Sequence, residues 1–193
     1  MVHSIVPLAV LEAVQNLDTP VEDGLTEFAD ELLVKRLGLS PTIQMQLTEF
    51  EELVRKDARV DDSHVEALLR LVGRGPDAVL VFAHAGRRAA RRAVKRTLGI
   101  VRMFGHTAAR RAARAVLGAE LAWDQHMPVA RVSDPIAIQA TPDGAACGFY
   151  GAGLVELLRL LVGYEGAMVH VACRARGGTG CEWRASAPDS RHQ

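Results

Sequence analysis

The three cysteines of this chain all lie in its last quarter, and they restrict how that part can fold. Cys173 and Cys181 stand eight residues apart on either side of a Gly-rich loop, Cys147 precedes them, and His170 lies three residues before Cys173. Three thiolates and an imidazole make the closed tetrahedral shell that suits structural zinc. The alternative is that three reduced cysteines are simply small buried hydrophobic residues. Spacing alone permits both interpretations.

The strand pattern around these residues sets a geometric condition on a shared metal site. Side chains alternate faces along a regular strand, so His170 and Cys173 should point in opposite directions. Joint ligation therefore requires a β-bulge or the end of a strand between them. Cys173 and Cys181 can face each other across a hairpin, and Cys147 can join them from the start of a helix. A site with four protein ligands is closed, which predicts a structural rather than a catalytic metal.

Composition narrows the class of protein without naming a function. The 193 residues carry no net charge and are 49% hydrophobic, which is typical of a globular chain with one sizeable core. The start lacks the features of a signal peptide, and no apolar run reaches the roughly 20 residues needed to span a bilayer. Together with an odd number of cysteines, this predicts a cytoplasmic protein without a membrane span or a disulfide framework.

Apolar residues at helical spacing dominate the first two thirds of the chain. They predict helices over residues 8–16, 25–37, 41–54, 63–72 and 77–94. The start of the last segment, Asp77–Phe82, is also compatible with a short strand, but the strong helix formers that follow favour a helix.

From Pro128 the pattern changes to one typical of strands, and Pro135–Ala140 continues in β-compatible residues. Thr141–Gly144 has the composition of a turn. A helix over 150–161 and strands over 166–174 and 181–185 follow. The predicted fold is α+β: a helical N-terminal part packed on a small antiparallel sheet, with a C-terminal helix and β-hairpin. The predicted division is a helical N-terminal extension (1–60), a ligand-binding domain (61–186) and a flexible tail (187–193).

Basic residues are concentrated in the middle of the chain, where no acidic residue occurs between Ala78 and Ala119. Spacing of four puts one row of cations on a helix face and a second row beside it. The two rows are Arg88, Arg92 and Arg96, and Arg87, Arg91 and Lys95. This face is either a patch for an anionic partner or an ordinary solvated helix face. No aromatic residue interleaves with the arginines, which disfavours nucleic-acid binding.

The segment Ala146–Trp183 resembles the vinyl-reductase-type (4VR) small-molecule-binding domain. That domain occurs in the bacteriochlorophyll 4-vinyl reductase family and in phenol- and xylene-sensing activators, and it is distantly related to transport-particle subunits. The resemblance is carried by a cysteine before a helix, a second cysteine, seven spacers and a final cysteine before an aromatic residue. It extends less closely back to Asp61. The loop Gly178–Gly180 departs from the acidic, bulkier loop of many members.

The resemblance implies roles for particular residues. Cys147, Cys173 and Cys181 match zinc ligands of the phenol-sensing members, and His170 stands where that family has a carboxylate. Imidazole is at least as good a ligand for zinc as carboxylate is.

The family also binds aromatic molecules or hydrocarbons in an apolar cavity between helices and sheet, where a tryptophan and a histidine orient a hydroxyl group. The residues that could take these roles are Trp123 and His126, which share a face if their segment is helical, together with His106 and His84. The alternative for each is an ordinary surface or core position.

No motif supplies the chemistry of a reductase. Gly148–Gly153 has the wrong spacing for a dinucleotide-binding loop and no preceding βαβ strand, so its glycines are expected to allow close packing. We therefore expect non-enzymatic binding of a small hydrophobic or aromatic ligand by a zinc-stabilised sensor or carrier that passes its signal or cargo to a protein partner. One alternative is a factor in (bacterio)chlorophyll biosynthesis that acts on a tetrapyrrole vinyl group. Another is a homodimeric interaction module that resembles transport-particle subunits.

Overall fold

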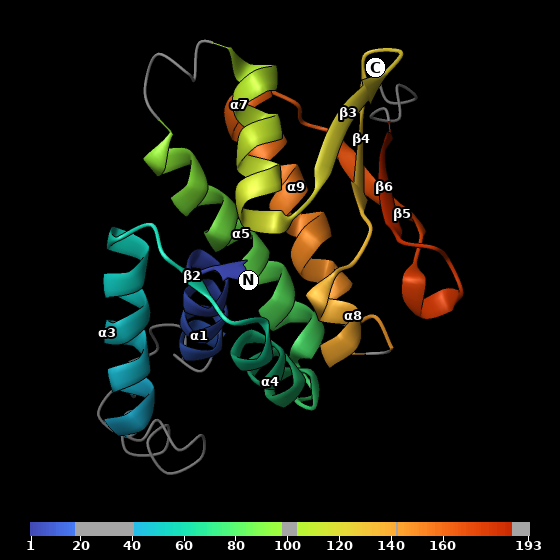
Figure 1. Ribbon diagram of the computed structural model, residues 1–193. Coiled ribbons are helices and arrows are strands. Elements are labelled where there is room, and N and C mark those ends of the chain that lie inside the picture. Colours follow the sequence, from blue (N-terminus) through green and yellow to red (C-terminus); the bar gives the residue numbers. More distant parts are fainter. Residues whose placement is uncertain (18–40, 98–103, 142, 187–193) are drawn as a thin grey trace, which may run out of the picture.

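The computed structural model describes residues 1–17, 41–97, 104–141 and 143–186 (Figure 1). The helix predicted over 25–37 and the tail 187–193 lie outside the described residues. The described helices are α1 (Ile5–Leu17), α3 (Pro41–Arg55), α4 (Asp62–Gly73), α5 (Ala78–Arg96), α7 (Gly105–Ala112), α8 (Ile136–Ala140) and α9 (Cys147–Val162). The strands are β1 (Val2–His3), β2 (Arg59–Val60), β3 (Glu120–Asp124), β4 (Met127–Val132), β5 (Ala167–Ala172) and β6 (Cys181–Ser186). The α+β class is confirmed.

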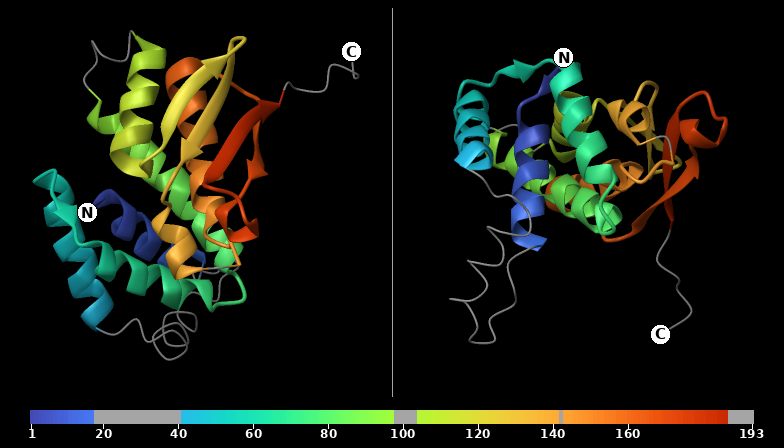
Figure 2. Two further views of the ribbon diagram at one scale, coloured as in Figure 1. Left: turned by 45° about the vertical axis from the view of Figure 1, so that its right-hand side comes forward. Right: turned by 90° about the horizontal axis from the view of Figure 1, so that it is seen from below.

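Helix α5 lies at the centre of the helical part, between α1 and α9 (Figures 1 and 2). Its crossing with α9 is so close that a Cβ atom added to Gly86 would lie 2.1 Å from the carbonyl oxygen of Phe149. On the α9 side, Gly153 faces Leu117 and Gly86, and Gly151 faces Trp183 of the sheet. The glycines of α9 thus serve close packing, as the sequence indicated, against α5 as well as against the sheet.

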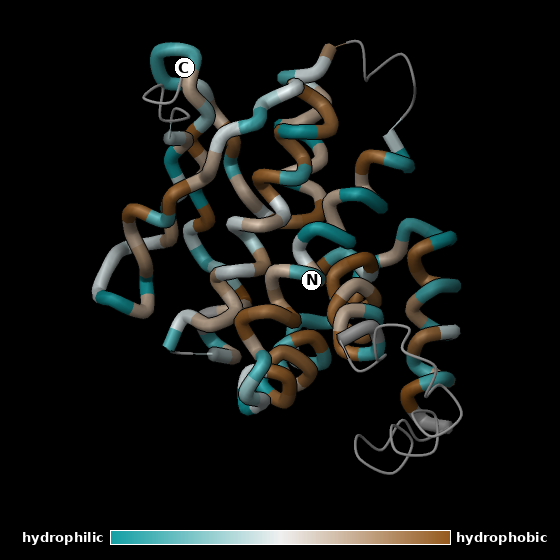
Figure 3. Tube along the Cα trace, turned by 180° about the vertical axis from the view of Figure 1, so that it is seen from behind, coloured by the Kyte–Doolittle hydropathy of each residue, from teal (hydrophilic) through white to brown (hydrophobic). Residues whose placement is uncertain are grey.

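Helix α1 confirms the first predicted helix but is less amphipathic than its sequence suggested. Its residues from Ile5 to Val10 are buried on all sides, because α3, α4 and α5 surround it. In contrast, α3 shows apolar and polar residues alternating around the helix (Figure 3), with Leu47 buried and Met45 exposed. Asp61 caps α4, accepting a hydrogen bond from the backbone N–H of Ser63 at 2.9 Å.

The four-stranded sheet is antiparallel throughout and has the strand order β3-β4-β6-β5. Helices α7 and α9 pack against it (Figure 2). One cross-strand row contains Leu121, Ala130, Trp183 and His170. Trp183 is 2% exposed and belongs to the same core as Ile5 of α1, so a single hydrophobic core extends from the first helix to the last strand.

One sequence prediction in this region is wrong, and the condition attached to another is not met. Ile136–Ala140 forms α8 instead of continuing as a strand, and it packs on α4. The short helix closes with a hydrogen bond from the Thr141 N–H to the carbonyl of Ala137. The condition that Trp123 and His126 share a helix face is also not met. Trp123 lies in β3, and positive φ angles at Gln125 and His126 form the turn to β4.

Most of the basic residues predicted on α5 hold helices together. Arg88 and Arg92 pair with Glu12 of α1, and Arg91 pairs with Glu156 of α9 at 2.6 Å. Arg96 pairs with Asp57 and also donates to the carbonyl of Val54. The remaining two cations, Arg87 and Lys95, have no ion-pair partner among the described residues. Among these residues, no helix is both long enough and apolar enough to cross a membrane.

Candidate functional site

Cys147, His170, Cys173 and Cys181 come together in space, and their ligand atoms all lie within 4.8 Å of one another. The Sγ atoms of Cys147 and Cys173 are 3.9 Å apart. The three cysteines are buried and His170 is half-buried. The sulfur separation is far above the roughly 2.05 Å of a disulfide bond and close to the roughly 3.8 Å expected between two thiolates bound tetrahedrally at 2.3 Å from zinc.

A turn places Cys147 at the first position of α9. The N–H of Cys147 donates to the carbonyl of Gly144 at 2.9 Å, and Gly144 has a φ of +82°. A Cβ atom at Gly144 would lie 3.7 Å from the Sγ atoms of both Cys147 and Cys173. The turn predicted at Thr141–Gly144 therefore forms one wall of the cluster. The N-terminus of a helix also favours the negative charge of a thiolate at Cys147.

A β-bulge brings His170 and Cys173 to the same cluster. The pairing of β5 with β6 shifts register between His170 and Ala172, and Cys173 lies just beyond the last residue of β5. A 3₁₀ turn, Arg174–Arg176, then leads the chain towards Cys181. Joint ligation required a β-bulge or a strand end between these two residues, and the structure contains both.

The imidazole of His170 is held in place and has one ring nitrogen free. It stacks on Trp183 with a centroid distance of 4.4 Å and an interplanar angle of 7°. Nε2 is buried and has no hydrogen-bond partner among the described residues. A buried imidazole nitrogen without a hydrogen-bond partner can serve as a metal ligand.

Without a metal ion, burial favours the neutral forms of the side chains in this cluster. Burial raises the pKa of Cys147 well above its usual range, and the neighbouring Cys181 and Cys173 raise it further. Burial also raises the pKa of Cys181, although the backbone N–H of Arg174 opposes this. Burial lowers the pKa of His170, so its neutral form is favoured. A divalent cation reverses the preference of the thiols, because a coordinated thiol is deprotonated. These four residues could therefore bind a metal ion, and their closed arrangement fits a structural role.

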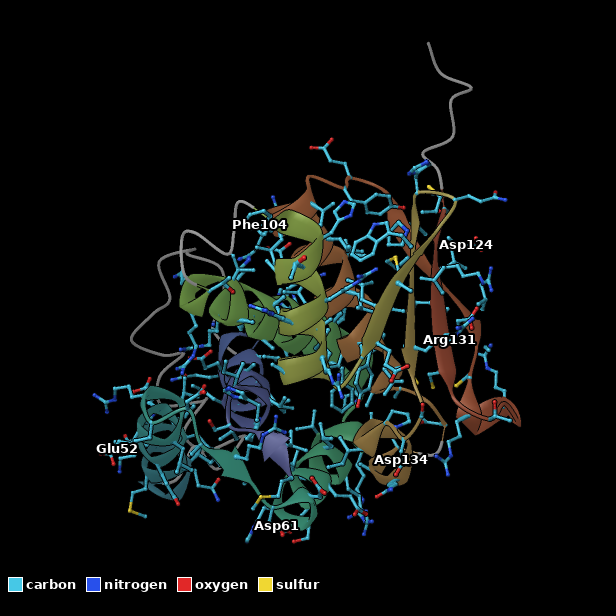
Figure 4. All side chains as sticks on the ribbon, turned by 45° about the horizontal axis from the view of Figure 1, so that its top comes forward. Glu52, Asp61, Phe104, Asp124, Arg131 and Asp134 are labelled. Atoms are coloured by element: carbon cyan, nitrogen blue, oxygen red, sulfur yellow. The ribbon has the colours of Figure 1, made fainter. Side chains whose placement is uncertain are left out.

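A cavity of about 400 Å³ lies beyond the first turn of α9. Phe149 and Tyr150, two and three residues after Cys147, contribute to its lining. Its other walls come from the start of the chain, a π-helical turn at Ala113–Leu117 that follows α7, strand β4 and α8. Figure 4 labels Arg131 on β4 and Asp134 beyond its end, both of which also line the cavity. Cavities of this size accommodate small organic molecules.

Of the four residues predicted for ligand binding, two are in contact with each other and two are exposed elsewhere. His106 of α7 stacks on Trp123 of β3, with centroids 4.4 Å apart and an interplanar angle of 4°, and the guanidinium of Arg110 lies 5.1 Å from the Trp123 ring centre. His126 is exposed in the β3–β4 turn, and His84 is exposed on α5. None of the four lines the cavity beside α9. The structure thus joins His106 with Trp123 and leaves the other two separate.

Sequence reasoning did not identify the residues that line this cavity, because they come from many distant segments. Gly118, with a φ of +61°, ends the π-helical turn and was one local signal of a break there. Comparison of the chain with protein-family models, with curated proteins and with solved structures found no match to any of them.

Proposed function

We propose that this chain is a zinc-stabilised domain of the vinyl-reductase type that binds a small hydrophobic or aromatic molecule without chemically changing it, as a sensor or carrier. The observation that carries the proposal is the cluster of the His170 imidazole with three buried sulfur atoms, together with a buried Nε2 of His170 that has no hydrogen-bond partner among the described residues. A buried polar atom without a partner is costly, and a metal ion would satisfy it.

Zinc is the metal that fits these donors best. Thiolate sulfur and imidazole nitrogen are its usual ligands in closed structural sites, whereas Mg²⁺ and Ca²⁺ prefer oxygen. Cys147, His170, Cys173 and Cys181 would hold the ion, which would supply a cross-link between the start of α9 and the β5–β6 hairpin. The same residues match the ligand positions of the resembling family, with His170 replacing a carboxylate.

The ligand-binding part of the proposal rests on the cavity next to the metal cluster. Phe149 and Tyr150 belong to the helical turn that begins at Cys147, so the cross-link would also fix one wall of the cavity. His3, the histidine that lines this cavity, is engaged by the N–H of Ile5 and by Asp57. Both ring nitrogens of this histidine are therefore engaged by the protein itself.

Metal analysis of the purified protein tests the proposal. We expect about one equivalent of zinc per chain by plasma mass spectrometry, in line with a single closed site. Cys173→Ser should lose the metal, and His170→Ala should weaken zinc affinity by about 10-fold or more. His84→Ala, an exposed histidine on α5, is the matched control and should keep a full equivalent. Less than about half an equivalent in the unsubstituted protein would contradict the proposal.

A further inference from the structure

The cavity beside α9 has an apolar inner wall. Val6, Val116, Leu117, Ile136 and Phe149 line it, and four of them are buried. A molecule held there would be stabilised by burial of its apolar groups.

The outer part of the cavity is charged, and most of its charges are already neutralised. Asp134 pairs with Arg174 at 2.8 Å. Arg131 binds Glu182 at 2.6 Å and lies opposite Glu120 in the β3–β4 register. These groups need no charged ligand.

Asp62 completes the acidic lining. It accepts a bond from the amino group of Met1 at 2.7 Å. The carboxylates around the cavity therefore all have a cation close by.

Two guanidinium groups of the lining, unlike the charges above, are not neutralised by an opposite charge among the described residues. Arg59 donates to a backbone carbonyl, that of Met1, at 3.2 Å, and has no carboxylate partner among the described residues. The guanidinium group of Arg114 has neither an ion pair nor a hydrogen bond within the described part of the chain. Guanidinium groups favour bidentate bonds to carboxylates and related anions. The cavity thus contains two cations whose preferred partner is missing.

The backbone that carries Arg114 is itself unusual. Ala113–Leu117 forms a π-helical turn, which inserts an extra residue into a helix and is frequent at functional sites. In this turn Val116 and Leu117 are buried while Arg114 and Ala115 are exposed, and all four line the cavity. The turn therefore offers both apolar contacts and a free cation to one ligand.

We infer that this cavity binds a small monoanion with an apolar body, an aromatic or short aliphatic carboxylate, whose carboxylate is bound by Arg114 and Arg59. The inference rests on the proposed ligand-binding function and specifies the class of ligand. The carboxylate of such a ligand can take bidentate bonds from a guanidinium group, while its apolar body contacts the inner wall of the cavity.

The test compares two probes of nearly the same shape, 1-naphthoate and its neutral amide, 1-naphthamide, by titration calorimetry on the metal-loaded protein. We expect naphthoate to bind more tightly than naphthamide. Arg114→Gln and Arg59→Gln should each weaken naphthoate binding by about 10-fold or more, as loss of a charged hydrogen bond does, and change naphthamide binding less than about 2-fold.

Two further variants locate the site. Arg87→Gln removes a cation outside this cavity that has no ion-pair partner among the described residues, and it should leave both affinities unchanged. Ala115→Trp, at an exposed lining position, should fill the cavity and abolish binding of both probes while the thermal melt stays cooperative. Equal affinity for the two probes, or naphthoate binding insensitive to Arg114→Gln, would overturn the inference alone. If neither probe binds, the proposed ligand-binding function fails with it.

Discussion

Glu156 is a buried carboxylate of α9 that links two arginines. It accepts from Nε of Arg91 at 2.6 Å and from Nη2 of Arg159 at 2.9 Å. The bonds from Arg159 lower its pKa most, burial opposes them, and Arg91 lowers the pKa further. A carboxyl group whose pKa is lowered on folding stabilises the protein above its unfolded pKa and loses this contribution as pH falls through the folded value.

We therefore expect Glu156→Gln to reduce the free energy of unfolding by about 1–2 kcal/mol at pH 7, since it removes charged hydrogen bonds from a buried position. The deficit should shrink as the pH falls below about 4.5 and vanish in stronger acid. Urea unfolding at several pH values measures it. Glu66→Gln, which removes a surface pair with Arg70, is the control and should cost no more than about 0.5 kcal/mol. A deficit that does not depend on pH would contradict the assignment.

At the metal cluster the sequence predicted the residues and one condition for bringing them together. Three cysteines with a nearby histidine sufficed to nominate the cluster, and strand alternation required the bulge or strand end that is found between His170 and Cys173. The stacking of His170 on Trp183 could not be predicted, because it depends on the register of β5 against β6. Register is a tertiary property that local spacing does not encode.

Among the helices, α5 and α9 approach each other backbone to backbone. The Cα of Gly86 faces the backbone of Phe149, and a Cβ atom there would lie 2.1 Å from the carbonyl oxygen. Backbone cannot move aside as a flexible side chain can. Gly86→Ala should therefore force the helices apart and destabilise the protein by about 1–3 kcal/mol, despite the higher helix propensity of alanine.

Gly148→Ala provides the matched control for this prediction. Its Cβ atom would meet no atom closer than the carbonyl oxygen of Val79, at 3.7 Å. Alanine at this position of α9 should be neutral or stabilise the fold by up to about 1 kcal/mol. Thermal and urea unfolding of both variants check the pair. Equal effects of the two substitutions would show that the close crossing does not limit packing.

Elements were predictable where their periodicity was strong and local. The helices over 41–54, 63–72 and 77–94 are present as α3, α4 and α5. Pro135–Ala140 was misassigned because short apolar segments fit a helix or a strand equally well, and packing on α4 decides between them. Strand β3 was missed for the same reason: its state depends on pairing with β4.

At the scale of the whole molecule, the candidate metal cluster and the helical core would be separate sources of stability. The four ligands come from the start of α9 and from the β5–β6 hairpin, whereas α1 and α5 are held by apolar burial and by ion pairs to Glu12. Among the described strands, β5 is at the edge of the sheet and pairs only with β6. The hairpin would therefore depend more on the proposed metal cross-link than the helical core does.

This difference predicts how the molecule responds to loss of the proposed zinc ion. After treatment with a chelator, amide hydrogen exchange should become faster in β5, in β6 and in the first turn of α9, and stay slow in α1 and α5, because local opening follows the weakest contacts. Hydrogen exchange with mass spectrometry of peptides measures this. Cys173→Ser should show the faster hairpin exchange already without chelator and should not respond to it. Faster exchange throughout α1 and α5 would mean instead that the whole core requires the ion, as in domains that fold only with their metal.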